Sequence, residues 1–169
     1  TTNQGLEILL GNSSGGGGGA TGYLPAAAPR SIELKDVNGD GFLDSITNDG
    51  TRISVLLANS DGTLKAGSSY SMSITNLNDT FTLKDFNNDG YTDIGVISST
   101  SGDVAISLGN SNGSFKSAIS YDAGTSAANG IDSADINGDG VFDIVIGNSS
   151  NPTATVLIGN SNGSFKTGI

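Results

Sequence analysis

The chain has 169 residues, the size of one ordinary domain, and 35% of them are hydrophobic, which is sufficient for strands that bury one face. Its 26 Gly disfavour helix interiors, and a formal charge of -10 with only seven Lys and Arg argues against nucleic-acid binding. The absence of Cys and His excludes thiol nucleophiles, thiolate or imidazole metal sites, and catalysis by a histidine base. No segment reaches transmembrane length, so we expect an all-β fold without membrane insertion.

The first predicted strand belongs to a short aliphatic block, residues 6–12, that recurs along the chain. Its later copies are residues 53–59, 104–110 and 154–160. Each later copy is followed, one residue on, by a dipeptide typical of tight hairpins: Asp61-Gly62, Asn112-Gly113 and Asn162-Gly163. In the first copy the Gly run at 15–19 stands where this turn stands in the others. We interpret it as a degenerate hairpin turn, with a flexible interdomain linker as the alternative.

Three nine-residue segments share the pattern D-x-N-x-D-G-x-x-D, at residues 36–44, 85–93 and 135–143. They recur at offsets of 49 and 50 residues, and a constant period predicts stacked structural units. Strand-like segments precede the three loops at 31–35, 80–84 and 130–134, and others follow at 42–46 and 141–146. One repeat therefore holds about four strands in about fifty residues, the size of one propeller blade.

Each loop presents oxygen atoms at alternate positions, the ligand type that a hard cation such as Ca²⁺ prefers. Side chains at positions one, three, five and nine would supply oxygens, and position seven its carbonyl. A Gly at position six permits the tight curl around an ion. The sequence predicts three Ca²⁺ sites with these ligands: Asp36, Asn38, Asp40, Phe42 and Asp44; Asp85, Asn87, Asp89, Tyr91 and Asp93; Asp135, Asn137, Asp139, Val141 and Asp143.

Two helical calcium motifs and the ordinary polar turn fit the loops less well. An EF-hand needs a bidentate Glu at position twelve, where this chain has Thr47, Val96 and Ile146. A dockerin-type loop also needs an acidic twelfth residue and a following helix. Ordinary polar turns do not need an acid at both ends. A closed cage leaves no position for substrate, so we expect the ions to be structural rather than catalytic.

The loops and the aliphatic blocks that follow them resemble the FG-GAP or VCBS repeats of integrin α-subunit propellers and of many bacterial surface proteins. The segment 23–29 matches the FG-GAP portion only loosely, so the bacterial VCBS-like type is the closer likeness. The resemblance implies a β-propeller of four-stranded antiparallel blades. It also implies Ca²⁺ between the first two strands of a blade and ligands bound on another face.

The repeat divides residues 1–169, a single repeat domain, into about three to three and a half blades. Residues 1–23 are predicted to form partial blade strands with the Gly-rich turn, and 24–70, 71–121 and 122–169 one blade each with one calcium loop. Known propellers need about four to eight blades to close. We therefore expect a partial propeller: either a segment of a longer parent chain, or one half of an intermolecular ring formed by self-association.

These features predict a secreted or cell-surface, Ca²⁺-stabilised module for binding or adhesion, with a protein or glycan ligand and no enzymatic activity. A carbohydrate-binding lectin and a non-catalytic part of a polysaccharide-degrading enzyme are the alternatives. The recurrent Tyr23, Tyr70 and Tyr121 are expected to pack between blades, although they could stack on sugars. The recurrent Lys65, Lys116 and Lys166 are expected to be solvated, and the acids outside the loops form no evident pair.

Overall fold

The computed structural model describes residues 5–11, 21–23, 28–125, 128–149 and 152–166, and in these ranges the chain forms antiparallel sheets and no helix. The first blade is a sheet in the order β3-β4-β5-β6. Its strands are β3 (Ser31–Lys35), β4 (Asp44–Asn48), β5 (Arg52–Leu56) and β6 (Ser68–Ser71). The second blade repeats this order with β7 (Leu77–Lys84), β8 (Asp93–Ser98), β9 (Val104–Ser107) and β10 (Ile119–Tyr121).

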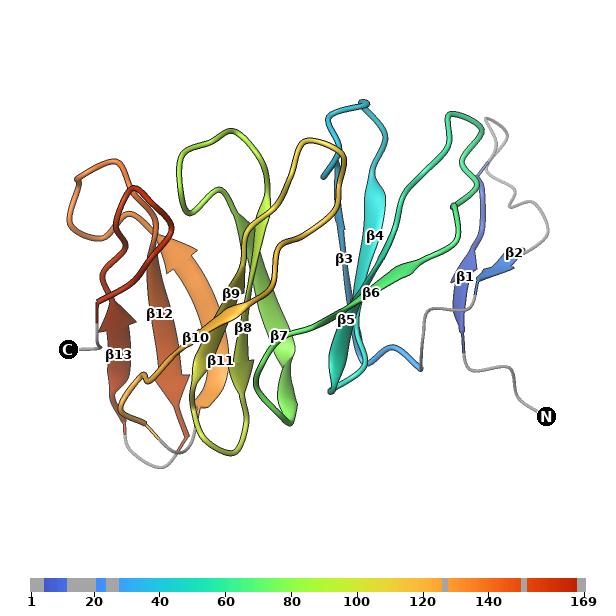
Figure 1. Ribbon diagram of the computed structural model, residues 1–169. Coiled ribbons are helices and arrows are strands. Elements are labelled where there is room, and N and C mark those ends of the chain that lie inside the picture. The colour runs from blue at the N-terminus through green and yellow to red at the C-terminus, as the bar shows by residue number, and fades with distance from the viewer. Residues whose placement is uncertain (1–4, 12–20, 24–27, 126–127, 150–151, 167–169) are drawn as a thin grey trace.

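The third blade contains the first three strand positions within the described residues. Its strands are β11 (Ala128–Ala134), β12 (Asp143–Asn148) and β13 (Ala154–Leu157). Figure 1 shows the blades side by side, which confirms the prediction of an all-β chain built from propeller blades in a partial propeller. The second strand of each blade begins at the ninth loop residue, so the segments that start at Phe42 and Val141 enter the sheet two residues later than expected.

A two-stranded sheet, β1 (Leu6–Ile8) with β2 (Thr21–Tyr23), precedes the first blade. Its register sets Tyr23 opposite Leu6, as Tyr121 lies opposite Val104 in the second blade. β1 and β2 therefore correspond to the third and fourth strands of a blade, and we call them the half-blade. The predicted turn at 15–19 lies outside the described residues. No helix in the described part of the chain is long and apolar enough to span a membrane.

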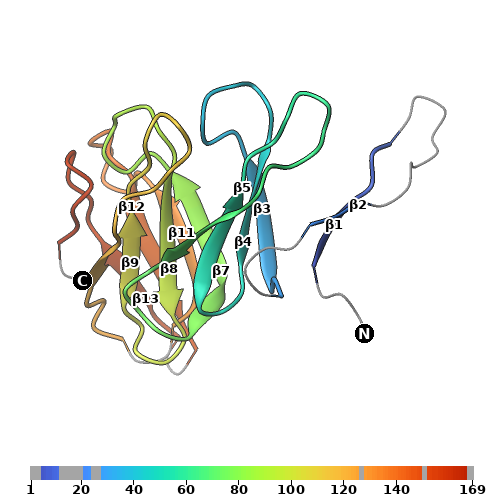
Figure 2. The ribbon, with the colours of Figure 1, turned by 45° about the vertical axis from the view of Figure 1, so that its right-hand side comes forward.

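The apolar core lies between the blades, because alternate residues of each strand point toward the preceding and the following blade. One cluster joins Ile46 and Val55 of the first blade to Phe81 and Ile94 of the second. The other joins the second blade to the third around Phe86, which is fully buried. Figure 2 shows the sheets stacked face to face, the arrangement that encloses these clusters.

Two of the three recurrent tyrosines, Tyr70 and Tyr121, pack between blades as predicted. The ring of Tyr70 meets that of Phe115 edge to face at a centroid distance of 5.4 Å, and Tyr121 meets Phe165 in the same way at 5.6 Å. Each pair joins the fourth strand of one blade to the second residue after the hairpin dipeptide of the next blade. Tyr70 and Tyr121 are half-buried, whereas Lys65, Lys116 and Lys166 are exposed, as the sequence predicts.

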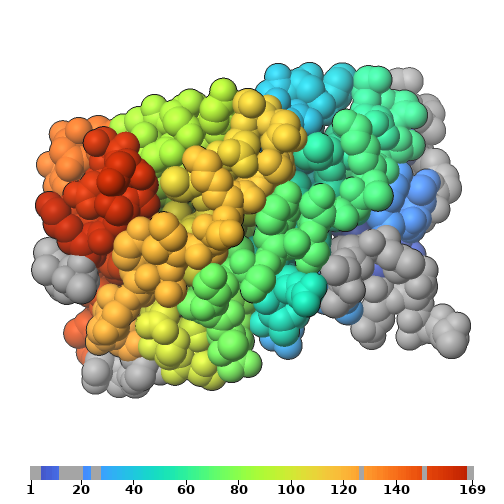
Figure 3. Space-filling model, in the orientation of Figure 1, coloured from blue at the N-terminus to red at the C-terminus, as the bar shows by residue number. Residues whose placement is uncertain are grey.

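The blades also contact one another at the edge where the loops lie, because the hairpin turn of one blade packs against the loop of the preceding blade. Gly113 has a φ of 76°, and a Cβ atom there would lie 2.8 Å from Leu57 and 3.2 Å from the Cβ of Asn38 in the preceding blade's loop. Gly163 meets Leu108 and Asn87 in the same way. Figure 3 shows these turns lying directly against the neighbouring loops. A residue without Cβ is therefore required both by the backbone conformation and by the close approach.

The first strands of the blades come together on one side of the molecule. Hydroxyl groups of Thr82 on β7 and Ser133 on β11 lie 2.8 Å apart and are buried. Glu33 on β3 and Asp132 on β11 line one groove of about 380 Å³ there. Burial raises the pKa of Glu33 above its usual value, and the carboxylate of Asp132 raises it further. The fold thus creates an acidic pair that is not evident in the sequence.

This pair makes a testable contribution to the pH dependence of stability. Because the folded pKa of Glu33 is raised, the unfolded chain releases the proton first, and this contribution falls as pH rises through the range just above 4.5. We expect Glu33→Gln to be more stable than the parent at pH 7, by well under ~1 kcal/mol because solvent screens the pair, and to lose this advantage near pH 4. Urea unfolding in EDTA at several pH values measures it.

Glu7→Gln on the half-blade removes the same charge from an exposed site and serves as the control. Asp132→Asn should give a gain that does not add to that of Glu33→Gln, because each substitution removes the same repulsion. Fully additive gains, or an equal gain from Glu7→Gln, would show that the two carboxylates do not interact.

Candidate metal centres

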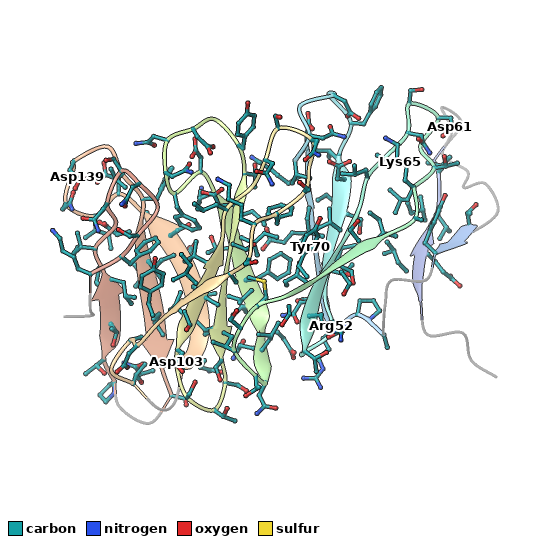
Figure 4. The ribbon with its side chains drawn as sticks, in the orientation of Figure 1. Arg52, Asp61, Lys65, Tyr70, Asp103 and Asp139 are labelled. Atoms are coloured by element: carbon teal, nitrogen blue, oxygen red, sulfur yellow. The ribbon has the colours of Figure 1, made fainter. Side chains whose placement is uncertain are left out.

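Each predicted loop joins the first two strands of a blade, and all three lie along the same edge of the molecule (Figure 4, in which Asp139 marks the third loop). The first aspartate closes the curl by accepting the N–H of the sixth-position glycine. The N···Oδ2 distances are 2.8 Å from Gly41 to Asp36, 2.8 Å from Gly90 to Asp85 and 2.9 Å from Gly140 to Asp135. Positive φ angles of 83–87° at these glycines permit the turn.

The third and fifth side chains converge in every loop. The amide nitrogen of Asn38 donates to Asp40 Oδ2 at 2.9 Å, and the equivalent pairs have the same distance in the other two loops. The third-position Oδ1 accepts the backbone N–H of the fifth residue, and the fifth-position Oδ1 accepts that of the seventh. These short-range bonds hold the side-chain oxygens of positions one, three and five in one curled segment.

The ninth aspartate differs from the other loop acids because it is completely buried. Asp44 Oδ2 accepts the N–H of Val37 at 3.0 Å, and its Oδ1 accepts the N–H of Ala58 at 2.7 Å. The second and third blades repeat both bonds: Asp93 with Phe86 and Gly109, and Asp143 with Ile136 and Gly159. This residue therefore ties the loop to the end of the third strand.

The residues that donate just after the third strand, Ala58, Gly109 and Gly159, were not singled out by the sequence. Two of them, Gly109 and Gly159, lack a side chain for a steric reason: a Cβ on Gly109 would lie 2.2 Å from the carbonyl oxygen of Thr92, and one on Gly159 would lie 2.3 Å from that of Phe142. The recurrent Gly-Asn or Ala-Asn that ends each aliphatic block was the available signal. The role of this dipeptide cannot be recognised locally, because its N–H binds an aspartate that lies 14 or 16 residues earlier in the chain.

The electrostatics of the loops favour a cation. Burial opposes ionisation of Asp36, but hydrogen bonds from the backbone of Gly41, Gly39, Asn38 and Asp40 lower its pKa below the usual value. Burial raises the pKa of Asp93 to about 6 despite the N–H donors of Gly109 and Phe86, and the charges of Asp89 and Asp85 contribute to the rise. A bound cation would favour the ionised form of these clustered carboxylates.

The donor set fits a hard cation. Within the described residues, no three acidic side chains are already gathered in a metal-holding arrangement. The ligands predicted for each loop are more varied: carboxylates at positions one and five, an amide at position three, a carbonyl at position seven and the buried carboxylate at nine. Each oxygen of the ninth carboxylate has two lone pairs and gives one of them to an N–H, so one remains for an ion.

The acids outside the loops have local structural roles where their contacts are defined. Asp49 accepts from Thr51 and Arg52, and Asp61 accepts from Thr63, so both cap turns. Asp79 lies 3.7 Å from Arg30 in an exposed ion pair. Asp132 accepts the N–H of Ser133 at 2.8 Å, and in addition its charge acts on Glu33 across the groove.

Asp44→Asn tests the structural role of the ninth aspartate. The substituted amide would set its NH₂ group against one of two buried N–H donors, so we expect a loss of about 1–3 kcal/mol in unfolding free energy, even in EDTA. Asp40→Asn, at the exposed fifth position, is the matched control and should change stability by less than about 0.5 kcal/mol in EDTA. Equal losses in urea unfolding would contradict this distinction.

Comparison with known proteins agrees with this organisation. A family model described as an FG-GAP-like repeat matches residues 36–96 and again 85–146. Among solved structures, the chain is similar to a lectin of Agrocybe aegerita described in terms of specific recognition of non-reducing terminal N-acetylglucosamine. The TM-score is 0.58 at 23% identity, over 82% of this chain and 37% of that one. No curated protein matches the chain.

Proposed function

The chain belongs to the family of FG-GAP-like repeats, and we propose that it is a Ca²⁺-stabilised, non-enzymatic β-propeller segment that acts outside the cell as a binding or adhesion module. The observation that carries this proposal is the threefold repetition of one loop geometry, with the same hydrogen bonds at positions one, three, five and nine. A simple polar turn does not require this full set of side-chain hydrogen bonds.

Calcium is the cation that best suits this donor set. Every predicted ligand is an oxygen atom, and the chain has no Cys or His for a softer metal. Nine of the 17 acidic residues are in the loops, and three Ca²⁺ ions carry six positive charges, which would change the formal charge from -10 to -4. Exposed loops of modest affinity suit the millimolar Ca²⁺ found outside cells, which supports the proposed location.

In this proposal the metal supplies structural cross-linking, and the residues of the chain position it. Asp36, Asn38 and Asp40 of the first loop would direct their side chains to the ion, and Asp44 would anchor it to the sheet. The equivalent residues would do the same in the other loops. Because a closed cage has no position for substrate, catalysis at these sites is disfavoured. The ligand of the module would bind elsewhere, on the blade surfaces.

Metal removal tests the proposal. We expect Ca²⁺ to raise the melting temperature and EDTA to lower it, because the ion binds the folded loops and scarcely the unfolded chain. At a free Ca²⁺ concentration 100-fold above Kd, each site would add about 2.7 kcal/mol. Titration calorimetry should give three sites for the parent and two for Asp89→Ala.

Asp103→Ala is the matched control, because Asp103 lies in the turn between β8 and β9 at the opposite edge of the same blade (Figure 4). It should retain three sites. An unchanged melting temperature in Ca²⁺ and in EDTA would remove the metal proposal.

A carbohydrate is a second candidate ligand, favoured by the surface between the first two blades. A groove of about 310 Å³ there is lined by Tyr70 and Phe115, by the exposed Lys116 and by several serines. Aromatic rings beside hydroxyl and ammonium groups can stack on a sugar and hydrogen-bond its hydroxyls. The similarity to a lectin structure supports this candidate at the level of the fold.

Glycan-array binding tests the carbohydrate candidate. We expect glycans with terminal N-acetylglucosamine among the bound set, and we expect Tyr70→Phe to weaken binding by removing the hydroxyl while keeping the ring that packs on Phe115. Tyr91→Phe, on an exposed loop residue outside this groove, is the control and should bind as the parent does. If Tyr70→Phe binds the same glycans as strongly as the parent, the glycan site lies elsewhere. If the parent binds no glycan on the array, the carbohydrate candidate is wrong.

A further inference from the structure

The two ends of the blade stack carry apolar faces that their internal counterparts bury. We call the side of a blade that faces the preceding blade its leading face, and the opposite side its trailing face. In the first blade, the leading face includes Ile32 and Leu34 on β3. In the third blade, the trailing face includes Ile136 in the loop, Val145 on β12 and Val156 on β13.

Matched positions show how the leading face is normally covered. Leu34 is 60% exposed, whereas its counterpart in the second blade, Leu83, is 9% exposed because the first blade packs on it. Ile32 is 46% exposed against 5% for its counterpart Phe81. The first blade therefore presents to solvent the surface that the second blade buries in an established interface.

The trailing face of the third blade shows the same contrast. Ile136 is 52% exposed, whereas the residues at its position in the other blades, Val37 and Phe86, are 4% and 0% exposed. Val145 and Val156 are only half-buried, whereas Ile46 and Val55, their counterparts in the first blade, are fully buried in the core between blades. Both ends are thus incomplete copies of the same interface.

The half-blade leaves the inner part of the leading face open. An apolar groove of about 450 Å³ separates β1 from the first blade, lined by Leu6 and Ile8 on one side and by Ile32, Leu34 and Leu43 on the other. β1 and β2 correspond to third and fourth strands, so the groove lies where the first and second strands of a blade would pack. Figure 2 shows β1 and β2 standing apart from the sheet that β3 begins.

We propose that a second copy of this chain covers the leading face, with the trailing face of its third blade, so that copies associate head to tail. Continuity with the internal interfaces supports this pairing, because a trailing face of this repeat already packs on a leading face twice within the chain. The incoming β11 and β12 fit the first- and second-strand positions in the groove. The incoming β13 takes the place of β1, so the half-blade, which pairs with no other described strand, is displaced from its contact between Leu10 and Gly62 of the first blade.

The internal interface also fixes the register of the proposed contact. On β7 and β11, the trailing-face Thr82 meets the leading-face Ser133 at 2.8 Å. Asp132 occupies the position of Thr82 in the third blade, and Leu34 occupies that of Ser133 in the first. The same register would set Asp132 of one copy opposite Leu34 of the next. A charge placed at position 34 would therefore face the carboxylate of Asp132 in the neighbouring copy.

The contact joins two different surfaces, which distinguishes it from a symmetric dimer. Every copy keeps one free leading face and one free trailing face after pairing, so further copies can add until a ring closes. Sedimentation velocity of the full chain over a range of concentrations should show association beyond a dimer. Leu34→Asp and Ile136→Asp should each give monomers, with an apparent Kd raised roughly tenfold or more, because each removes one of the two faces.

Mixing the two variants is the decisive step. Leu34→Asp keeps an intact trailing face and Ile136→Asp an intact leading face, so their mixture should form complexes of two chains and no larger species. Leu34→Lys should associate more strongly than Leu34→Asp, because its ammonium group would meet Asp132. Circular dichroism should be unchanged in all variants, since the substituted residues are exposed.

Ile119→Asp is the matched control, because Ile119 is also exposed but belongs to the fourth strand of the second blade, away from both end faces. It should associate as the parent does. A parent chain that stays monomeric would overturn the proposal and leave the faces to further blades of a longer chain. If Ile136→Asp alone still associates, the contact is a symmetric one between leading faces. If Ile119→Asp loses association as much as the end-face variants do, the contact is nonspecific. Either result would also overturn the head-to-tail proposal.

Discussion

The structure of every blade depends on one buried carboxylate. The ninth loop aspartate accepts one N–H from the start of its own loop and one from the end of the third strand, as Asp44 does with Val37 and Ala58. A charge removed from water is strongly unfavourable unless it is hydrogen-bonded, so the two donors must be in place whenever the blade is folded. The raised pKa of Asp93 shows that two N–H donors do not fully offset burial, which leaves a role for a cation.

Because this aspartate fixes the loop on the sheet, it also determines how the blades stack. The hairpin turn of each following blade packs on the loop, with Gly113 against Asn38 and Gly163 against Asn87. Below these contacts, the sheets enclose two apolar clusters of the same design. Bound ions at the loops would therefore strengthen the blade and the contact with its neighbour together, although they would touch no ligand.

A stack of such blades leaves one face uncovered at each end. Each blade provides one face to its predecessor and another to its successor, so a run of blades leaves the first leading face and the last trailing face uncovered. Leu34 and Ile136 mark these two surfaces. The proposed binding function uses a third kind of surface, the grooves between outer strands. The proposed metal sites, the faces for association and the ligand grooves thus lie on separate parts of the repeat.

The sequence by itself determined the features that depend on near neighbours. The loop pattern, the positive-φ glycines and the hairpin turns involve residues two to five positions apart, and the period of the repeat gave the all-β propeller architecture. Thus the candidate ligands at positions one, three and five could be placed before any fold was known.

Only the tertiary structure decided the features that join distant segments. The bond of Asp44 to Ala58, the acidic pair of Glu33 and Asp132, and the contact of Thr82 with Ser133 depend on how strands pair and blades stack. Likewise, Leu34 and Leu83 are the same residue in equivalent positions, yet one is exposed and the other buried. The sequence around them is alike, and the physical difference is whether a neighbouring blade covers them.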